Sequence, residues 1–209
     1  MRIGHFSDIH GNIRKLLASS ELPDVWVCSG DLFPNETRGD RDIEPAFQAA
    51  WFKGVVDSLI ARLGGRPVIW VGGNHDYVNL VELLRENGYE AAYDATVAPV
   101  DIGGHRFAGA EGIPWIAGEW RTEEQDLTPM VDRVFEMDPT ILVTHGPPAG
   151  ILDAVGYGNR PLTTALAYRP HRIVAHLFGH AHDHGGQSIH EMGIHFFNGA
   201  EHVRFIDVC

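Results

Sequence analysis

The sequence contains only two cysteines among its 209 residues, Cys28 and Cys209, and so few exclude a disulfide framework. Cys28 lies in a short apolar run that predicts a buried strand, and such thiols are typical of a reducing compartment. The chain also has no apolar run of membrane length, and it begins directly with its first predicted strand, which leaves no room for a signal peptide. We therefore expect a cytoplasmic protein that does not enter a membrane.

Positive charge is scarce as well. The chain has 16 Lys and Arg against 28 Asp and Glu, which gives a formal net charge of −12 at pH 7. A sequence-independent contact with nucleic acid requires a basic surface, so that class of function is disfavoured. A small phosphorylated substrate remains compatible with an acidic exterior, because bound metal ions would supply local positive charge.

Low-complexity linkers and internal repeats are also absent. An apolar content of 44% in a chain of this length suits one domain, residues 1–209, with a substantial core. Histidine, in contrast, is unusually frequent, with 13 residues, and this excess needs an explanation.

Short apolar runs alternate with amphipathic stretches along most of the chain. The predicted strands are Arg2–Phe6, Val25–Cys28, Pro67–Val71, Thr140–Thr144 and Ile173–Phe178, and the predicted helices are Ile13–Ala18, Pro45–Leu63, Asn79–Asn87, Thr128–Met137 and Leu162–Tyr168. This alternation favours largely parallel sheets with right-handed crossovers. A hairpin of Thr96–Ile102 and His105–Ala110, and short final strands at Gln187–His190, Ile194–Asn198 and Val203–Val208, add antiparallel pairs. We therefore predict an α/β fold, a four-layer α/β/β/α sandwich of two mixed β-sheets flanked by helices.

Two local patterns lead to more detailed expectations. In the long helix, the residues at a spacing of four predict one broad buried face together with Val56 and Ile60 beside them, and they are Phe47, Trp51, Val55, Leu59 and Leu63. Asn12 is expected to cap the first helix. Strands covered on both faces should bury Val25, Val27, Val68, Ile69, Val71, Leu142 and Val143.

Polar side chains of metal-ligand type follow five of the predicted strands. They are Asp8 and His10, Asp31, Asn74 to Asp76, His145, and His180 with His182. Ligands in α/β folds bind beyond the carboxyl ends of strands, so we expect these side chains to meet. A lone buried histidine is more often a hydrogen-bonded core residue, but the full ordered set indicates a metal site. Oxygen and nitrogen donors without thiolate suit Mn²⁺, Fe or Zn²⁺.

The same motifs, in this order, resemble the motif series of the calcineurin-like metallophosphoesterases. They are Asp8-x-His10, Gly30-Asp31, Gly73-Asn74-His75-Asp76, His145-Gly146 and Gly179-His180-x-His182, and the resemblance extends from Arg2 to Asn198. Pro114-Trp115 and the run Thr144 to Pro148, followed by Gly150 and Asp153, are similar to a small-phosphodiesterase branch that includes the animal metallophosphoesterase-domain proteins. The phosphoprotein-phosphatase branch has arginine four residues after the bridging aspartate, where this chain has Asn35.

The resemblance implies two divalent metal ions, with Mn²⁺ favoured, that share Asp31. Asp8, His10, Asp31 and His182 would hold one ion, and Asp31, Asn74, His145 and His180 the other. A hydroxide shared by the ions would attack phosphorus, His75 would protonate the leaving oxygen, and Asp76 would orient His75. Asn12, His184 and Trp115 are expected to contact the substrate, and Trp115 or Trp120 could stack on a nucleobase.

The expected activity is a phosphodiesterase acting on a small phosphoester, with a nucleotide as one candidate. A phosphomonoesterase is the alternative within enzymes. A catalytically silent metal-binding scaffold is a third hypothesis, since a fold does not guarantee activity, but the chain retains every expected ligand and His75. The acidic run Glu119–Asp126 is expected to be a solvated surface.

Overall fold

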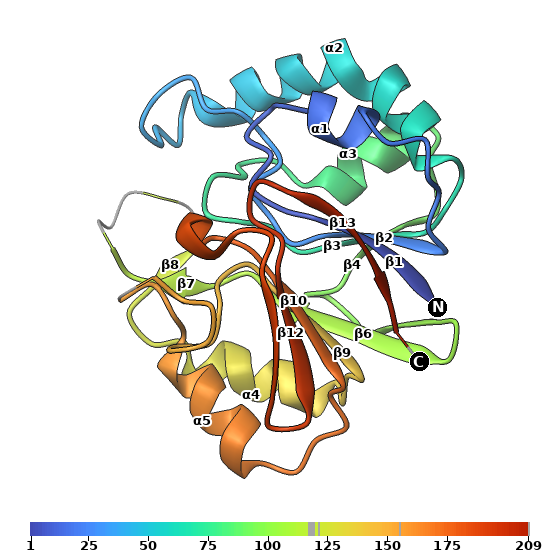
Figure 1. Cartoon of the computed structure of the whole chain (residues 1–209). Helices are drawn as coiled ribbons and strands as arrows, with labels where there is room; N and C mark the ends of the chain where they lie inside the picture. Colours follow the sequence, from blue (N-terminus) through green and yellow to red (C-terminus); the bar gives the residue numbers. More distant parts are fainter. Residues whose placement is uncertain (117–119, 121, 155, 209) are drawn as a thin grey trace.

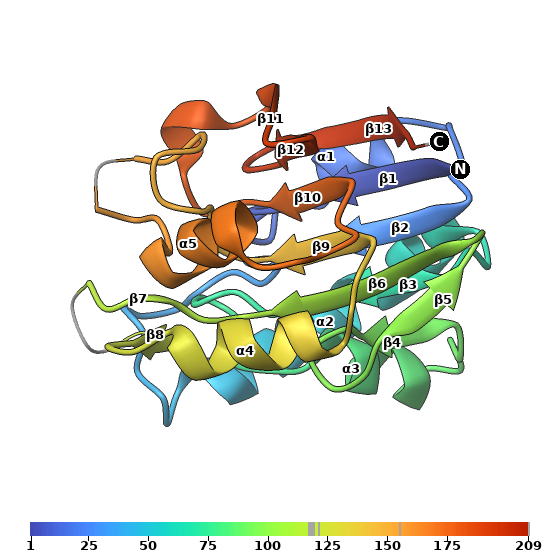
Figure 2. The same cartoon turned by 90° about the horizontal axis from the view of Figure 1, so that it is seen from below.

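A computed structural model describes residues 1–116, 120, 122–154 and 156–208. Two large mixed β-sheets pack face to face, and helices cover the outer face of each (Figures 1 and 2). The predicted α/β/β/α sandwich is therefore confirmed. Cys209 and the Glu119 end of the acidic run lie outside the described residues. No helix in the described part of the chain is both long and apolar enough to cross a membrane.

The first sheet has the strand order β13-β1-β2-β3-β4. Its strands are β1 (Arg2–Phe6), β2 (Val25–Cys28), β3 (Val68–Trp70), β4 (Ala92–Asp94) and β13 (Val203–Asp207). Strands β1 to β4 run parallel, and β13 pairs antiparallel with β1. The helices α1 (Arg14–Leu17), α2 (Glu44–Leu63) and α3 (Leu80–Glu86) cover its outer face (Figure 1). The sequence did not predict β4, because Ala92, Tyr93 and Asp94 do not form an apolar run.

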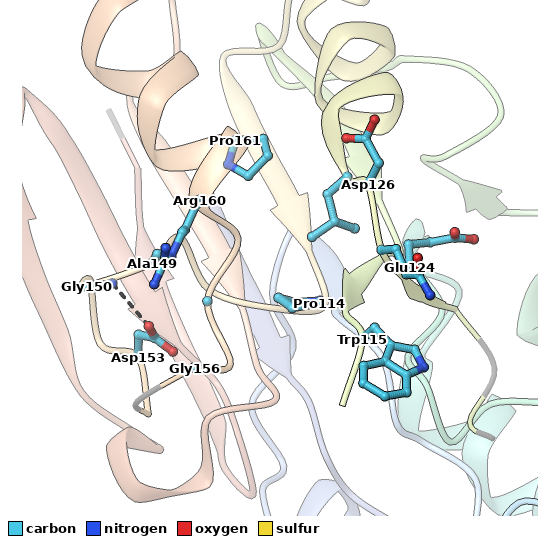
Figure 3. Close-up of a pocket in the computed structure, with 13 residues that line it drawn as sticks. Pro114, Trp115, Glu124, Asp126, Ala149, Gly150, Asp153, Gly156, Arg160 and Pro161 are labelled. Carbon is cyan, nitrogen blue, oxygen red and sulfur yellow. Dashed lines mark hydrogen bonds between the residues drawn. The ribbon is translucent and has the colours of Figure 1, made fainter. Parts of the chain in front are cut away.

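The second sheet has the order β11-β12-β10-β9-β6-β5. Its strands are β5 (Val100–Ile102), β6 (His105–Ala110), β9 (Ile141–Thr144), β10 (Ala175–Phe178), β11 (Ser188–Glu191) and β12 (Ile194–Asn198), with α4 (Thr128–Glu136) and α5 (Arg160–Tyr168) outside. Between β6 and α4, β7 (Ile113–Pro114) forms a parallel pair with β8 (Glu123–Glu124), and this pair forms one wall of a cavity (Figure 3). A 3₁₀ turn, η1 (His182–His184), follows β10.

Side chains of the first sheet point alternately to its two faces, and each face contributes to a separate apolar layer. Trp26 and Cys28 pack toward the helices, whereas Val25 and Val27 pack toward the second sheet. All seven residues predicted to be buried are inaccessible to solvent. The central strands are therefore covered on both faces, and polar side chains concentrate where these strands end.

Two expectations about helices need correction. The buried face of α2 includes Gln48 and Phe52, which were not expected there, and Val56, Leu59 and Leu63, which were, while Phe47 and Trp51 are only half-buried. A spacing of four overshoots the 3.6 residues of each helical turn, so the predicted stripe drifts across the helix surface. The first helix begins after Ile13, which forms no side-chain cap, so the expected Asn12 cap was wrong.

Candidate metal centre

The carboxyl ends of five strands bring the predicted ligands together. Asp8, Asp31 and Asn74 follow β1, β2 and β3 of the first sheet, and His145 and His180 follow β9 and β10 of the second. Asp8, Asp31, Asn74 and His145 are buried, His10 and His180 are half-buried, and His182 lies at the exposed rim. The centre thus spans both sheets and is open to solvent on one side.

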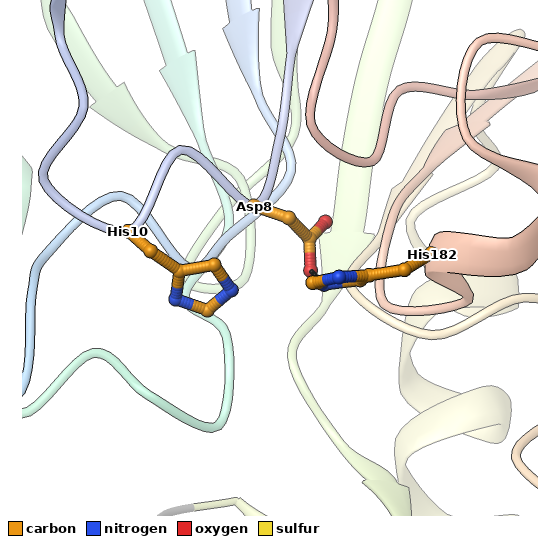
Figure 4. A group of neighbouring side chains, drawn as sticks. All are labelled: Asp8, His10 and His182. Carbon is orange, nitrogen blue, oxygen red and sulfur yellow. Dashed lines mark hydrogen bonds and ion pairs between the residues drawn. The ribbon is translucent and has the colours of Figure 1, made fainter.

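One group of donors consists of Asp8, His10 and His182, whose potential ligand atoms all lie within 4.8 Å of one another (Figure 4). Nε2 of His182 lies 3.0 Å from Oδ1 of Asp8, and the ring centroids of His10 and His182 are 5.6 Å apart. Oδ2 of Asp8 accepts hydrogen bonds from the Ser7 hydroxyl at 2.6 Å and from the His180 amide at 2.9 Å. These bonds fix the carboxylate between the two imidazoles.

A second group consists of Asp8, Asp31 and His145. Nε2 of His145 lies 3.2 Å from Oδ2 of Asp31 and 2.9 Å from Oδ1 of Asn74. Nδ1–H of His145 donates to the Ser29 carbonyl at 2.8 Å. With that nitrogen as the donor, a neutral His145 ring would present the lone pair of Nε2 to a bound metal ion, as in many metal-binding histidines.

The backbone at the centre adopts conformations that most residues avoid. Asp8, His10, Asp31 and His180 have φ angles of 53°, 46°, 53° and 65°. Positive φ is uncommon outside glycine, and such strain tends to occur at functional sites. Gly30, with φ of 103°, has no alternative, because a Cβ there would lie 2.5 Å from Nδ1 of His145. Strained turns therefore direct the donors inward.

Charge is concentrated among the buried donors. Burial alone would raise the pKa of Asp31, but the adjacent His145 imidazole outweighs this effect and holds the pKa well below its usual range. For His145, burial acts to lower the pKa, and Asp31 raises it to about 10. Asp31 is thus a carboxylate at neutral pH, and in the absence of metal its charge is balanced by the His145 imidazolium.

The donor set fits divalent metal ions. Nε2 of His180 is buried and has no hydrogen-bond partner among the described residues. Burial, and next the neighbouring His145, lowers the pKa of His180 to about 4, so its ring is neutral and retains a lone pair. A buried imidazole nitrogen without a partner, beside two buried carboxylates, is the environment that a cation would stabilise. Seven donors meet here, without a thiolate.

His75 lies at the edge of the centre, with its ring centroid 5.0 Å from that of His10. Its Nδ1 lies 2.7 Å from Oδ1 of Asn35, and its ring lies 4.0 Å from the Trp120 ring. Gln48 of α2 donates to the His75 carbonyl at 2.6 Å and accepts from the Tyr77 amide at 2.7 Å. The sequence had not led us to expect a role for Asn35 or Gln48. The one signal that could have pointed to Gln48 is its polar side chain among the apolar residues of the long helix.

Asp76 is placed differently from the sequence expectation that it orients the His75 ring. Its buried carboxylate accepts hydrogen bonds from the backbone amides of Asp31, Gly73 and Phe33 at 2.8, 2.9 and 3.1 Å. It therefore joins the loop after β2 to the loop after β3. The partner on Nδ1 of His75 is Asn35, because the loop after β2 passes directly beside that ring.

The three predicted substrate contacts all lie at the surface around the centre. Asn12 is exposed on the turn after His10, and His184 is half-buried in η1, with Nδ1 3.4 Å from Oε1 of Gln187. Trp115 is 53% exposed and lines the cavity beside β7 and β8 (Figure 3). Their positions allow contact with a bound substrate, and their roles stay predictions.

Residues 1–184 match the sequence model of a protein family described as Calcineurin-like phosphoesterase. The fold is similar to that of the protein TT1561 of Thermus thermophilus, with 16% sequence identity, a TM-score of 0.62, and coverage of 95% of this chain and 90% of that chain. It is also similar to a phosphopantetheinyl hydrolase from Mycobacterium tuberculosis, with 16% identity, a TM-score of 0.56, and coverage of 93% and 86%. No curated protein matches the chain.

Proposed function

The chain belongs to the calcineurin-like phosphoesterase family, and from this membership we propose that it is a phosphodiesterase with two divalent metal ions, Mn²⁺ being favoured. The family implies a metal-dependent phosphoester hydrolase. The diester preference, the number of ions and the identity of the metal are our proposal. We further propose that residues 1–209 act as one domain, similar to the small-phosphodiesterase branch that shares Pro114-Trp115.

The position of Asp31 carries the proposal of two ions. Oδ2 of Asp31 lies 4.0 Å from Nε2 of His10 and 3.2 Å from Nε2 of His145. One carboxylate oxygen thus lies between a donor from each group, and a carboxylate can bridge two ions. When bound, such ions supply Lewis-acid charge that binds phosphate oxygens and activates water. We assign Asp8, His10, Asp31 and His182 to one ion, and Asp31, Asn74, His145 and His180 to the other.

His75 is our candidate general acid. Asn35 accepts from Nδ1–H, which leaves Nε2 available to carry a proton to the leaving oxygen. Burial lowers the pKa of His75, which makes its protonated form a stronger acid. Asp76 supports this arrangement by fixing the loops on either side, and Asn12, His184 and Trp115 are proposed to contact the substrate.

The side chains around the centre favour a diester over a monoester. They are carboxylates, imidazoles and amides, and Asn35 occupies the position at which the phosphoprotein-phosphatase branch has arginine. A monoester carries an additional negative charge, and a site that prefers it normally adds a cationic side chain. A phosphomonoesterase is therefore the second candidate, and a silent scaffold the third.

The proposal is tested with protein purified in excess Mn²⁺ and assayed on bis-nitrophenyl phosphate and nitrophenyl phosphate. We expect two metal ions per chain by elemental analysis and a higher kcat/KM for the diester. Asp31→Asn should lose most activity and metal from both sites, because it removes the charge of the shared ligand. Asp57→Asn, on the exposed side of α2, is the matched control and should retain both.

Three outcomes would overturn parts of this assignment. A single ion that does not depend on Asp31 would exclude the shared carboxylate. A strong preference for the monoester would establish the phosphatase alternative. Full metal content without hydrolysis of either ester would favour the scaffold.

A further inference from the structure

A cavity of about 670 Å³ lies between the β7–β8 pair and residues of the ranges 149–153 and 156–161. Figure 3 shows Trp115, Glu124 and Asp126 on one wall, and Asp153 and Arg160 on the other. The volume is in the range of pockets that hold small organic molecules. None of the metal-ligand candidates lines it, so its role is distinct from holding the metal ions.

The cavity adjoins the ligands that come from the second sheet. The wall on this side begins at Ala149, four positions after His145, and the Asn159 amide closes this segment into a loop by donating to the Pro147 carbonyl at 2.8 Å. In the same loop, the Tyr157 ring lies 5.4 Å from the His180 ring. The cavity therefore lies on the side of the centre formed by His145 and His180. A substrate whose phosphate is at the centre would extend past these two residues to place a group in the cavity.

His75 occupies a different part of the centre. Its ring contacts His10 and Trp120, and its Nδ1 contacts Asn35 of the first-sheet loops. A phosphodiester has two ester arms, and the arm that leaves must lie beside the general acid. A monoester has only the leaving arm. A second pocket, beside His145 and His180, would therefore bind part of a diester but no part of a monoester.

We propose that this cavity holds the ester arm that stays on phosphorus, and that this arm is flat, aromatic and uncharged, as in a nucleoside. The inference rests on the proposed phosphodiesterase function. In hydrolysis the bond from phosphorus to the leaving oxygen breaks, and that oxygen takes the His75 proton. The oxygen of water joins phosphorus, and a proton of that water is released. The cavity then contains the organic part of a phosphomonoester product.

The lining defines the chemical class of the retained arm. Trp115, half-exposed on β7–β8, offers an indole face for stacking. The described lining residues include one cation, Arg160, and three carboxylates, those of Glu124, Asp126 and Asp153. This excess of negative charge disfavours a further phosphate on the retained arm. Oδ2 of Asp153 accepts from the Gly150 amide at 3.1 Å, while its buried Oδ1 has no partner among the described residues. That oxygen would accept from an amino or hydroxyl group of the ligand.

The test compares two diesters with the same leaving group, methyl p-nitrophenyl phosphate and thymidine 5′-(p-nitrophenyl phosphate). Nitrophenolate needs little protonation, so the ratio of their kcat/KM values reports the retained arm. The wild type should prefer the thymidine ester, and Trp115→Ala should lower that preference by roughly tenfold, the value of one stacked base. Tyr168→Ala, 84% exposed at the end of α5, is the control and should leave the ratio unchanged.

A second readout is independent of catalysis. Thymidine binding to the metal-free protein, followed by ligand-observed NMR, should be detected for the wild type and lost in Trp115→Ala. An equal preference for the two esters in the wild type, or a ratio unaffected by Trp115→Ala, would overturn the inference while leaving the phosphodiesterase assignment intact. Failure to hydrolyse either diester would instead overturn the proposed function, and the NMR result would then decide whether the cavity takes a nucleoside.

Discussion

The Asn35 side chain sets the orientation of His75 through two contacts. Its Nδ2 donates to the His75 carbonyl at 3.3 Å, which identifies Oδ1 as the oxygen that accepts from Nδ1–H at 2.7 Å. A neutral amide in this position holds the ring without adding a negative charge next to it. Trp120 covers one face of the ring. Nδ1–H is therefore held by Asn35, and Nε2 is the nitrogen that would carry the proton in the proposed role as general acid.

His75→Ala should lower kcat by roughly 10²–10⁴ on an alkyl or nucleoside diester, because a poor leaving group depends on the proton from the acid. The loss should be much smaller on a nitrophenyl diester. Stopped assays on both substrates, together with metal analysis, measure this difference, and the metal content should stay at the wild-type value because His75 is not a proposed ligand.

Asn35→Leu is the companion variant, since it retains the imidazole and removes its Nδ1 partner. It should show the same dependence on the leaving group with a smaller loss. Equal losses on both leaving groups in His75→Ala would remove His75 as the general acid.

Among the helices, α3 has its first turn capped by a side chain. Oδ1 of Asn79 accepts from the amides of Val81 and Glu82 at 2.9 and 3.2 Å, and its Nδ2 donates to Asp94 of β4 at 3.0 Å. Asn79 thus caps the N-terminal turn of α3 and connects the helix to β4, the edge strand of the first sheet. The loop before α3 carries Asn74, His75 and Asp76, so this end of the helix supports the centre.

Asn79→Ala should lower the free energy of unfolding by about 1 kcal/mol, the typical effect of losing an N-cap. The midpoint of urea unfolding measures this change. Asn79→Ser retains a capping oxygen but loses the bond to Asp94, so it should be less destabilised. If the serine variant were as unstable as the alanine variant, the contact with Asp94 would be the dominant interaction.

Two histidines are completely buried within the sheets, away from the metal centre. Nε2 of His5 lies 2.9 Å from the Ser29 hydroxyl, and Nε2 of His176 lies 2.8 Å from that of Thr144. Burial lowers the pKa of each to about 3. Both are therefore neutral in the folded protein, while in the unfolded chain they take up protons below pH 6.5. Protonation of the unfolded state thus makes the fold progressively less stable between pH 6.5 and pH 3.

His176→Gln should reduce this dependence on pH. Between pH 7.5 and pH 5, the wild type should lose about 2 kcal/mol more free energy of unfolding than the variant, because His176 binds a proton over this range only in the unfolded chain. Urea unfolding of the metal-free protein at the two pH values measures the difference, and the titrations of His145 and His180 are common to both proteins. His190→Gln, at an exposed position on β11, should retain the wild-type dependence. An unchanged dependence in His176→Gln would mean that His176 titrates normally.

The local pattern of the chain was sufficient to predict the strand ends. Apolar runs followed by glycine and a ligand-type side chain predict where β1, β2, β3, β9 and β10 terminate, because strand periodicity and turn chemistry act over a few neighbouring residues. The same pattern predicted the glycine hairpin between β5 and β6, whose Gly103 and Gly104 both have positive φ. It also indicated that the site is made of oxygen and imidazole donors.

Only the tertiary structure decided how these donors are grouped and held. Asp8 and His182 are 174 positions apart, and Asp31 and Asp76 are 45 apart, yet the two residues of each pair are within direct hydrogen-bonding distance. No periodicity encodes such contacts, because they depend on which sheets pack together and at what register. The positive φ of Asp8 and Asp31, the contact of Asn35 with His75, and the cavity beside β7 and β8 likewise arise where separate segments meet. A sequence pattern describes one segment at a time, whereas this centre is formed by five.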